Sequence, residues 1–365
     1  MPSAVRAMVL EAFGEPLREH GFDLPEPGPG AMLVRVLAAG VCGSDLHIAS
    51  GRDPRVPLPL IPGHEVVGEV VATAPGKLDA FGAPVRTGDL IAFSRGITCG
   101  RCVYCAVKHT PALCSRRETY GISLSCAQPP YLNGGYAEAV YVRAESEVFP
   151  LPPDLDPVGL VGATCSGATA AHAVELAKVG LGDVAVVIGP GPLGLYAAAL
   201  ARESGAREVV VVGTGRNPAH LRLAEAGGFV PVDLSQTAQA DRQALVRGLT
   251  EGRGADVVLD CAGATASLTE ALALVAPGGT VAFPGVAAPT ADLAVDPYYL
   301  ARHQIRLQGV WVSEPRHLWQ ALRVAASMRY PLDALVTHVL PLTEANQALR
   351  LLRDREAVKV VLTPD

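Results

Sequence analysis

The sequence predicts an α/β protein in which a β-rich region precedes a doubly wound, parallel six-stranded sheet. Short apolar runs separated by glycine and proline fill the first 150 residues, and strand-like and helix-like segments alternate from Val184 onward. With 365 residues, 49% of them hydrophobic, the chain is long enough for two domains with buried cores.

The first region is expected to be rich in strands. Apolar runs predict strands at 32–36, 65–71 and 89–93, each bounded by glycine or proline. A helix is predicted at 163–179, where Gly180 can end it. We therefore place a first domain at 1–166, with a cysteine-rich lobe at 95–118 inside it.

The second region alternates strands with helices. Predicted helices cover 192–204, 219–226 and 241–250, and predicted strands cover 184–188, 208–212, 229–232, 256–260, 280–283 and 305–310. Alternation of this kind is typical of a parallel sheet with helices on both faces. We place this domain at 167–309 and expect residues 310–365 to return to the first domain.

The composition argues against several functions. The formal net charge is −6 without a long basic run, so a nucleic-acid partner is not expected. No apolar stretch reaches the roughly 18 residues of a membrane span, and Met1–Leu10 lack the pattern of a signal peptide. We expect a cytoplasmic protein without a membrane partner, in which clustered cysteines bind metal more often than they form disulfides.

A glycine-rich loop follows the first strand of the second region and opens a helix. This context predicts a dinucleotide site, because the first glycine permits the turn, the second admits a pyrophosphate and the third lets helix and strand pack closely. The alternative is a glycine-rich turn of another α/β protein. The predicted cofactor contacts are Gly189, Gly191, Pro192, Leu193 and Gly194.

The end of the second strand bears on the choice of cofactor. A carboxylate there would hold the ribose hydroxyl of NAD, but Val212 is followed by Gly213, Thr214, Gly215 and Arg216. We favour NADP, with Arg216 pairing with the 2′-phosphate. The alternative is NAD bound through Thr214 and backbone groups, with Arg216 in solvent.

Two groups of cysteine and histidine residues are spaced as zinc ligands. Cys42 and His64 lie 22 residues apart, and Cys165 directly precedes the nucleotide domain. Three protein ligands and an open position make a catalytic zinc. The alternatives are ordinary buried residues or a hydrolytic zinc, although the His-Glu-x-x-His pattern of many zinc hydrolases is absent.

The second group suits a closed, structural zinc. Four thiolates fill a tetrahedral zinc site and clamp a lobe that has little core of its own. Disulfide pairing is the alternative. The predicted ligands are Cys99, Cys102, Cys105 and Cys114.

These segments together resemble the zinc-dependent medium-chain dehydrogenases of the alcohol dehydrogenase superfamily, which combine a GroES-like catalytic domain with a Rossmann domain. The resemblance rests on residues 40–47, 63–65, 99–114, 189–194 and 337–342 and on the segment around Cys165. It implies two zinc ions per chain, with Cys42, His64 and Cys165 holding the catalytic one. This chain has eight residues between Cys105 and Cys114, where the family usually has seven, so it departs from the family's spacing at Cys114.

Further roles carry over from the resemblance. Asp45 would orient His64, and Glu65 would lie beside the metal or replace its water. Ser44 and His47 would form a proton relay, although a histidine without a role is the alternative for His47. The resemblance also implies two cofactor contacts. The backbone at Val286 would meet the carboxamide of nicotinamide, and Lys359 would reach the pyrophosphate. A solvated lysine is the alternative for Lys359.

The expected activity is oxidation of a primary or secondary alcohol, or reduction of its carbonyl compound, with NAD(P). Arg95 lies in a stretch that lines the substrate pocket of related enzymes, so it could pair with a carboxylate, phosphate or phosphonate; a solvent-facing arginine is the alternative. The competing functions are a zinc-free enone or quinone reductase and a non-catalytic relative. The family implies a homodimer or homotetramer.

Overall fold

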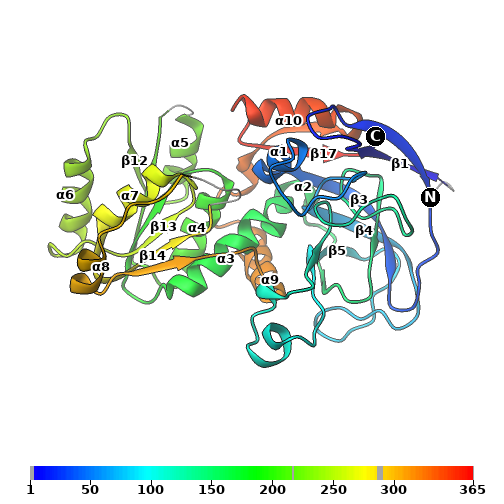
Figure 1. Cartoon of the computed structure of the whole chain (residues 1–365), viewed down its shortest axis with the longest axis horizontal. Coiled ribbons are helices and arrows are strands. Elements are labelled where there is room, and N and C mark those ends of the chain that lie inside the picture. The colour runs from blue at the N-terminus through cyan, green and yellow to red at the C-terminus, as the bar shows by residue number, and fades with distance from the viewer. Residues whose placement is uncertain (1–3, 216–217, 286–290, 365) are drawn as a thin grey trace. The chain divides into compact units, whose positions relative to one another are not determined.

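The chain divides into two compact units, each described by itself (Figure 1). The structure is a computed structural model that describes residues 4–215, 218–285 and 291–364. The first unit contains 4–165, Glu314–Trp319 and 335–364 of these, and the second contains Ser166–Ser313 and Gln320–Ala334.

A seven-stranded sheet forms the centre of the first unit. Its strands follow the order β16-β17-β3-β4-β5-β9, and β8 also pairs with β3. All pairs are antiparallel except β16 with β17. The strands are β3 (Met32–Val41), β4 (Val66–Thr73), β5 (Leu90–Phe93), β8 (Ala139–Val142), β9 (Val148–Pro150), β16 (Val336–Pro341) and β17 (Lys359–Thr363).

Shorter elements surround this sheet. Two antiparallel ribbons pair β1 (Ala4–Val9) with β2 (Arg18–Asp23) and β6 (Gly96–Ile97) with β7 (Glu118–Thr119). The helices of the unit are α1 (Gly43–Ala49), α2 (Pro157–Leu160) and α10 (Ala345–Arg353). The cysteine-rich lobe contains a π-helical turn at Val103–Val107 and a 3-10 turn at Pro111–Leu113.

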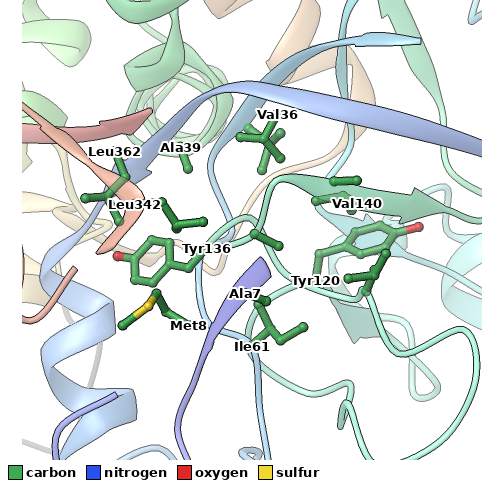
Figure 2. Close-up of a cluster of buried hydrophobic side chains, with 14 of the residues drawn as sticks. Ala7, Met8, Val36, Ala39, Ile61, Tyr120, Tyr136, Val140, Leu342 and Leu362 are labelled. Carbon is green, nitrogen blue, oxygen red and sulfur yellow. The ribbon is translucent and has the colours of Figure 1, made fainter. Parts of the chain in front are cut away.

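The hydrophobic core of the first unit is built from side chains of the seven-stranded sheet and of the segments that pack against it. Val34, Val36 and Ala39 of β3 are buried together with Met8 of β1 and Leu362 of β17. Figure 2 shows the rings of Tyr120 and Tyr136 among these aliphatic side chains. Both tyrosines are almost completely buried, so their hydroxyl groups need hydrogen-bond partners.

The second unit contains the predicted six-stranded parallel sheet. The order β12-β11-β10-β13-β14-β15 is that of a Rossmann fold, and every neighbouring pair is parallel. The fold class is therefore confirmed. The strands are β10 (Val184–Ile188), β11 (Glu208–Gly213), β12 (Val230–Asp233), β13 (Ala255–Asp260), β14 (Val275–Phe283) and β15 (Arg306–Gly309).

Helices connect these strands. Along the chain, β10 to β12 extend the sheet to one side, and β13 to β15 extend it to the other side. Because crossovers between parallel strands are right-handed, the two halves place their helices on opposite faces of the sheet. No helix among the described residues has both the length and the apolar character needed to cross a membrane. The helices of this unit are α3 (Ser166–Ala177), α4 (Pro192–Glu203), α5 (Pro218–Ala226), α6 (Gln239–Leu249), α7 (Thr265–Leu274) and α8 (Pro297–His303).

The division of the chain near its end differs from the expected one. The return was predicted at residue 310, but Gln320–Ala334 groups with the second unit, and α9 (Pro315–Ala326) crosses the boundary. Aromatic packing explains this difference. The ring of Tyr330 stacks on Phe229 at 5.7 Å, and its hydroxyl group donates to Glu203 at 2.8 Å.

Candidate functional site

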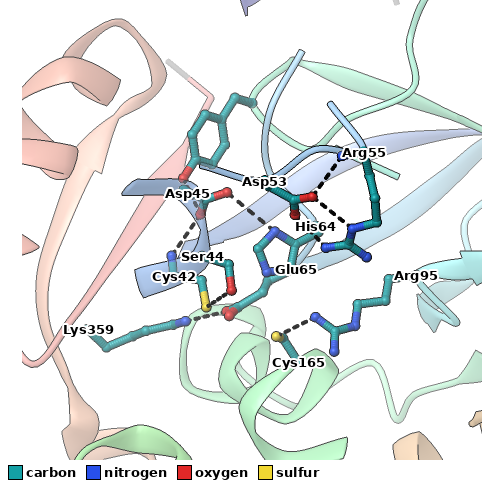
Figure 3. Close-up of polar contacts among 11 residues, drawn as sticks. Cys42, Ser44, Asp45, Asp53, Arg55, His64, Glu65, Arg95, Cys165 and Lys359 are labelled. Carbon is teal, nitrogen blue, oxygen red and sulfur yellow. Dashed lines mark hydrogen bonds and ion pairs between the residues drawn. The ribbon is translucent and has the colours of Figure 1, made fainter. Parts of the chain in front are cut away.

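A cluster of cysteine, histidine and glutamate lies at the ends of two central strands of the first unit's sheet. Cys42 follows β3, whereas His64 and Glu65 directly precede β4, and the antiparallel pairing of these strands brings the two segments together. Cys165 joins them from the turn before α3. The possible ligand atoms of these four residues lie within 4.8 Å of one another (Figure 3).

Asp45 holds one side of this cluster. Its Oδ2 accepts hydrogen bonds from the Cys42 amide at 2.8 Å and from the Tyr136 hydroxyl group at 2.9 Å. Its Oδ1 lies 3.3 Å from Nδ1 of His64, within ion-pair range but without hydrogen-bond geometry. Burial lowers the pKa of His64, but Asp45 and Cys42 outweigh this and raise it to about 10. Asp45 therefore faces one ring nitrogen of His64 and leaves Nε2 for another partner.

Lys359 and Glu65 form a buried ion pair beside Cys42 (Figure 3). The side chains are 3% and 0% exposed, so the solvated lysine considered above is wrong. Strand pairing explains the position, because β17 places Val360 opposite Val41 and so carries Lys359 to the end of β3. The expected contact of Lys359 with a pyrophosphate stays a prediction.

The pKa values of the two thiols of the cluster are shifted in opposite directions. The hydrogen bond with Cys165 lowers the pKa of Cys42, burial opposes this effect, and His64 adds to the lowering. The hydrogen bond with Cys42 and burial both raise the pKa of Cys165. Nη1 of Arg95 donates to Sγ of Cys165 at 2.6 Å. Arg95 is only 8% exposed, so the solvent-facing alternative for this residue is wrong.

The two residues of the expected proton relay lie on α1. Oγ of Ser44 lies 3.8 Å from Sγ of Cys42. His47, one helical turn further, is half-buried and lies on the same face of the helix as Ser44. Burial raises the pKa of Asp53, but hydrogen bonds from Arg55 outweigh this effect and lower the pKa. The charge of His47 lowers it further.

The donor set of this cluster fits a zinc ion. Two sulfurs, one imidazole and a neighbouring carboxylate are ligands that zinc prefers. Both ring nitrogens of His64 and Oε1 of Glu65 are buried without a hydrogen-bond partner among the described residues. Buried polar atoms rarely lack a partner, so a metal at this position would satisfy atoms that the protein leaves open.

The second cysteine cluster forms within the lobe. The possible ligand atoms of Cys99, Cys102, Cys105 and Cys114 lie within 4.8 Å of one another. The Sγ atoms of Cys102 and Cys105 are 3.5 Å apart, and all eight cysteines are free, so the disulfide alternative is wrong. A 3-10 turn at Pro111–Leu113 lies within the longer spacing before Cys114.

The glycine loop lies between β10 and α4, as predicted. Gly189 has a φ of +100°, and a Cβ at Gly194 would overlap the carbonyl oxygen of Gly189, so neither position tolerates a side chain. A Cβ at Gly191 would meet no atom within 4 Å. The loop therefore has open space where a pyrophosphate is expected, and Pro192 and Leu193 begin the helix behind it.

The turn after β11 is described only in part. Thr214 is exposed, and the amide of Gly215 donates to Oδ1 of Asp233 at 2.9 Å. Ser235 donates twice more to the same oxygen. The predicted sites Arg216 and Val286 lie outside the described residues.

Sequence reasoning missed several residues at the first cluster. Tyr136 reaches Asp45 from the loop before β8. Arg55 and Asp53 form an ion pair close to His47. Arg117 of the cysteine-rich lobe lies near Cys165. No spacing rule identifies these partners, because each depends on how separate segments pack.

Comparisons with known proteins agree with this architecture. Residues 28–153 match the family described as alcohol dehydrogenase GroES-like domain, and residues 192–327 match the family described as zinc-binding dehydrogenase. A 5-exo-hydroxycamphor dehydrogenase from Pseudomonas putida is 32% identical over 343 residues, covering 92% of each chain.

Solved structures give the same result. An alcohol dehydrogenase from Thermotoga maritima has a TM-score of 0.95 and 40% identity, with 99% of this chain and 100% of that chain covered. A protein from Sinorhizobium meliloti described as a zinc-binding dehydrogenase bound to NADP has a TM-score of 0.85 and 29% identity, covering 99% and 100%. These relatives support an oxidoreductase that uses zinc and a nicotinamide cofactor on a small molecule. The chain belongs to the zinc-dependent medium-chain alcohol dehydrogenase family.

Proposed function

We propose that this protein is a zinc-dependent alcohol dehydrogenase that transfers hydride between a primary or secondary alcohol and NAD(P). The observation that carries the proposal is the convergence of Cys42, His64 and Cys165. Nε2 of His64 is buried there without a hydrogen-bond partner among the described residues. These three residues would hold the catalytic zinc. When bound, zinc polarises the oxygen of the substrate, and the nicotinamide ring accepts or donates the hydride.

The surrounding side chains prepare this centre. Asp45, itself held by the Tyr136 hydroxyl group, orients the ring of His64. Lys359 neutralises the carboxylate of Glu65, so this carboxylate adds no net negative charge beside the thiols and the carboxylate of Asp45. The hydroxyl group of Ser44 would accept the proton of the substrate oxygen while donating its own to the cofactor ribose, and the imidazole of His47 would pass a proton from the ribose towards water.

The remaining roles complete the proposal. The loop from Gly189 to Gly194 binds the pyrophosphate, and Cys99, Cys102, Cys105 and Cys114 hold a second, structural zinc. NADP is favoured because no carboxylate ends β11 and Arg216 follows it. The NADP in the relative from Sinorhizobium meliloti supports this choice. We expect a cytoplasmic homodimer or homotetramer.

A panel of alcohols and carbonyl compounds tests the activity. Turnover should be measured with NAD and NADP while the zinc content per chain is determined. We expect activity that falls on removal of zinc, returns on its addition and has a higher kcat/KM with NADP. Equal activity in the zinc-free protein would overturn the metal's role, and a strong preference for NAD would overturn the role of Arg216.

A further inference from the structure

Two arginines lie close together on the ribbon of β6 and β7. Arg95 directly precedes β6, and Arg117 directly precedes β7. The strands pair antiparallel with Gly96 opposite Thr119, and the amide of Tyr120 donates to the carbonyl oxygen of Arg95 at 3.1 Å. The ribbon therefore fixes the backbone of both arginines in one place.

The absence of a side chain at Gly96 leaves room for the guanidinium group of Arg117. A Cβ at Gly96 would overlap the guanidinium group of Arg117, which lies against the backbone next to Arg95. Arg117 donates one hydrogen bond, from Nη1 to Thr119 Oγ1 at 2.7 Å. Its Nε is buried without a hydrogen-bond partner among the described residues. A buried donor of this kind requires a partner, which a water molecule, an ion or a ligand group can supply.

Arg117 lies near positive charges as well as cysteine thiols. Burial, and then the positive charges of Arg95 and Arg55, lower the pKa of Arg117 to about 9, against the weaker and opposite effects of Cys114 and Cys165. The carboxylate of Asp53 accepts a hydrogen bond from Nε of Arg55 at 2.9 Å, and Glu118 accepts one from Arg143 at 2.8 Å. Holding like charges together at a partly buried position is unfavourable unless an anion joins them.

Arg95 connects this ribbon to the metal cluster. Its Nη1 donates to Cys165 at 2.6 Å, and Figure 3 shows it on the side of the cluster opposite Lys359. The hydrogen bond to Cys165 accounts for one donor of Arg95. It does not account for Arg117, whose Nε stays open beside it.

We propose that Arg95 and Arg117 bind an anionic group, a carboxylate or a phosphoryl group, on the alcohol that this protein oxidises. The planar guanidinium group has the donor geometry that both oxoanions require. The inference rests on the proposed dehydrogenase function and assigns its substrate class. Arg117 and Gly96 extend the expectation that the sequence placed on Arg95 alone.

The wild-type holoenzyme gives the first test. The values of kcat/KM are compared for matched substrates, namely hydroxycarboxylates with their methyl esters and hydroxyalkyl phosphonates with their dimethyl esters. We expect the anionic member of at least one pair to be preferred, and the two series show which oxoanion fits. Preference for the neutral ester in both series would overturn the proposal.

Replacement of Arg117 gives the second test. Arg95 also contacts Cys165, so Arg117→Met is the more selective change. We expect it to lower the anionic-to-neutral ratio of kcat/KM by about 100-fold, because a substrate charge loses its partner. Arg117→Lys should recover part of the ratio. The matched control is Arg116→Met, because Arg116 is exposed and lies one residue away. An unchanged ratio in Arg117→Met would contradict the role.

A binding measurement separates this inference from the proposed function. Zinc-loaded protein is titrated calorimetrically with inorganic phosphate and, separately, with acetate. We expect Arg117→Met to weaken binding of at least one anion about 10-fold or more, and Arg116→Met to leave it unchanged. Equal binding by all three proteins would overturn the anion site. Absence of turnover with every alcohol would instead overturn the proposed function, while this titration still tests the arginines.

Discussion

Removal of Lys359 from its ion pair with Glu65 should destabilise the first unit strongly. In Lys359→Met, the carboxylate of Glu65 stays buried beside Cys42 without a countercharge. Loss of one partner from a buried pair costs roughly 3–5 kcal/mol. Burial already raises the pKa of Glu65, so uptake of a proton by the lone carboxylate limits the loss. For a unit of this size, the melting temperature should fall by roughly 6–20 °C.

Thermal and denaturant unfolding measure this effect. Both are recorded with saturating zinc, because metal bound to the folded state adds stability of its own. The cycle includes Glu65→Gln and the double variant Glu65→Gln/Lys359→Met. The double variant should be more stable than Lys359→Met, because it leaves no unpaired charge. Lys108→Met is the matched control, since Lys108 is exposed.

Two results would refute this reasoning. A loss in Lys359→Met of less than about 1 kcal/mol would mean that Glu65 finds another partner or water without cost. Strict additivity of the two single changes would mean that Lys359 and Glu65 do not interact energetically. Zinc content, measured on each variant, separates a change in stability from a loss of metal.

Three further predictions concern the metal clusters and the relay. Tyr136→Phe removes the hydroxyl donor to Asp45 and should weaken zinc binding at the first cluster about 10-fold, measured by competition with a chelator; unchanged affinity would contradict the orienting role of Asp45. Cys102→Ser should remove one of two zinc ions per chain and lower the melting temperature, and a zinc content that stays at two would exclude Cys102 as a ligand. His47→Ala should lower kcat at neutral pH and be partly rescued by imidazole. An unchanged pH–rate profile would count against the relay.

The fold of the second unit follows from local patterns. The run Val184–Ile188 is fully buried, and continuous apolar strands between helices indicate a parallel sheet. Patterns of this kind do not show where a domain ends. The division within α9 depends on contacts of Tyr330 with Phe229 and Glu203, which lie far from it in sequence.

The candidate site was predictable to a similar degree. Ligand types and spacings indicated Cys42, His64 and Cys165, because zinc chemistry restricts which side chains serve. The partners of these residues were not predictable from spacing. Lys359 reaches Glu65 only through the pairing of β17 with β3, and the length and charge of a lysine also suit an exposed strand.

The charges around the first cluster bear on the proposed substrate class. A zinc dication and two thiolates sum to zero, the pairs Lys359–Glu65 and Arg55–Asp53 are each neutral, and Arg95 can balance the charge of the Asp45 carboxylate. Nε of Arg117 has no hydrogen-bond partner among the described residues. A neutral alcohol would supply no charged acceptor for it. An anionic group on the alcohol would supply such an acceptor, at a distance from the oxygen that the zinc would polarise.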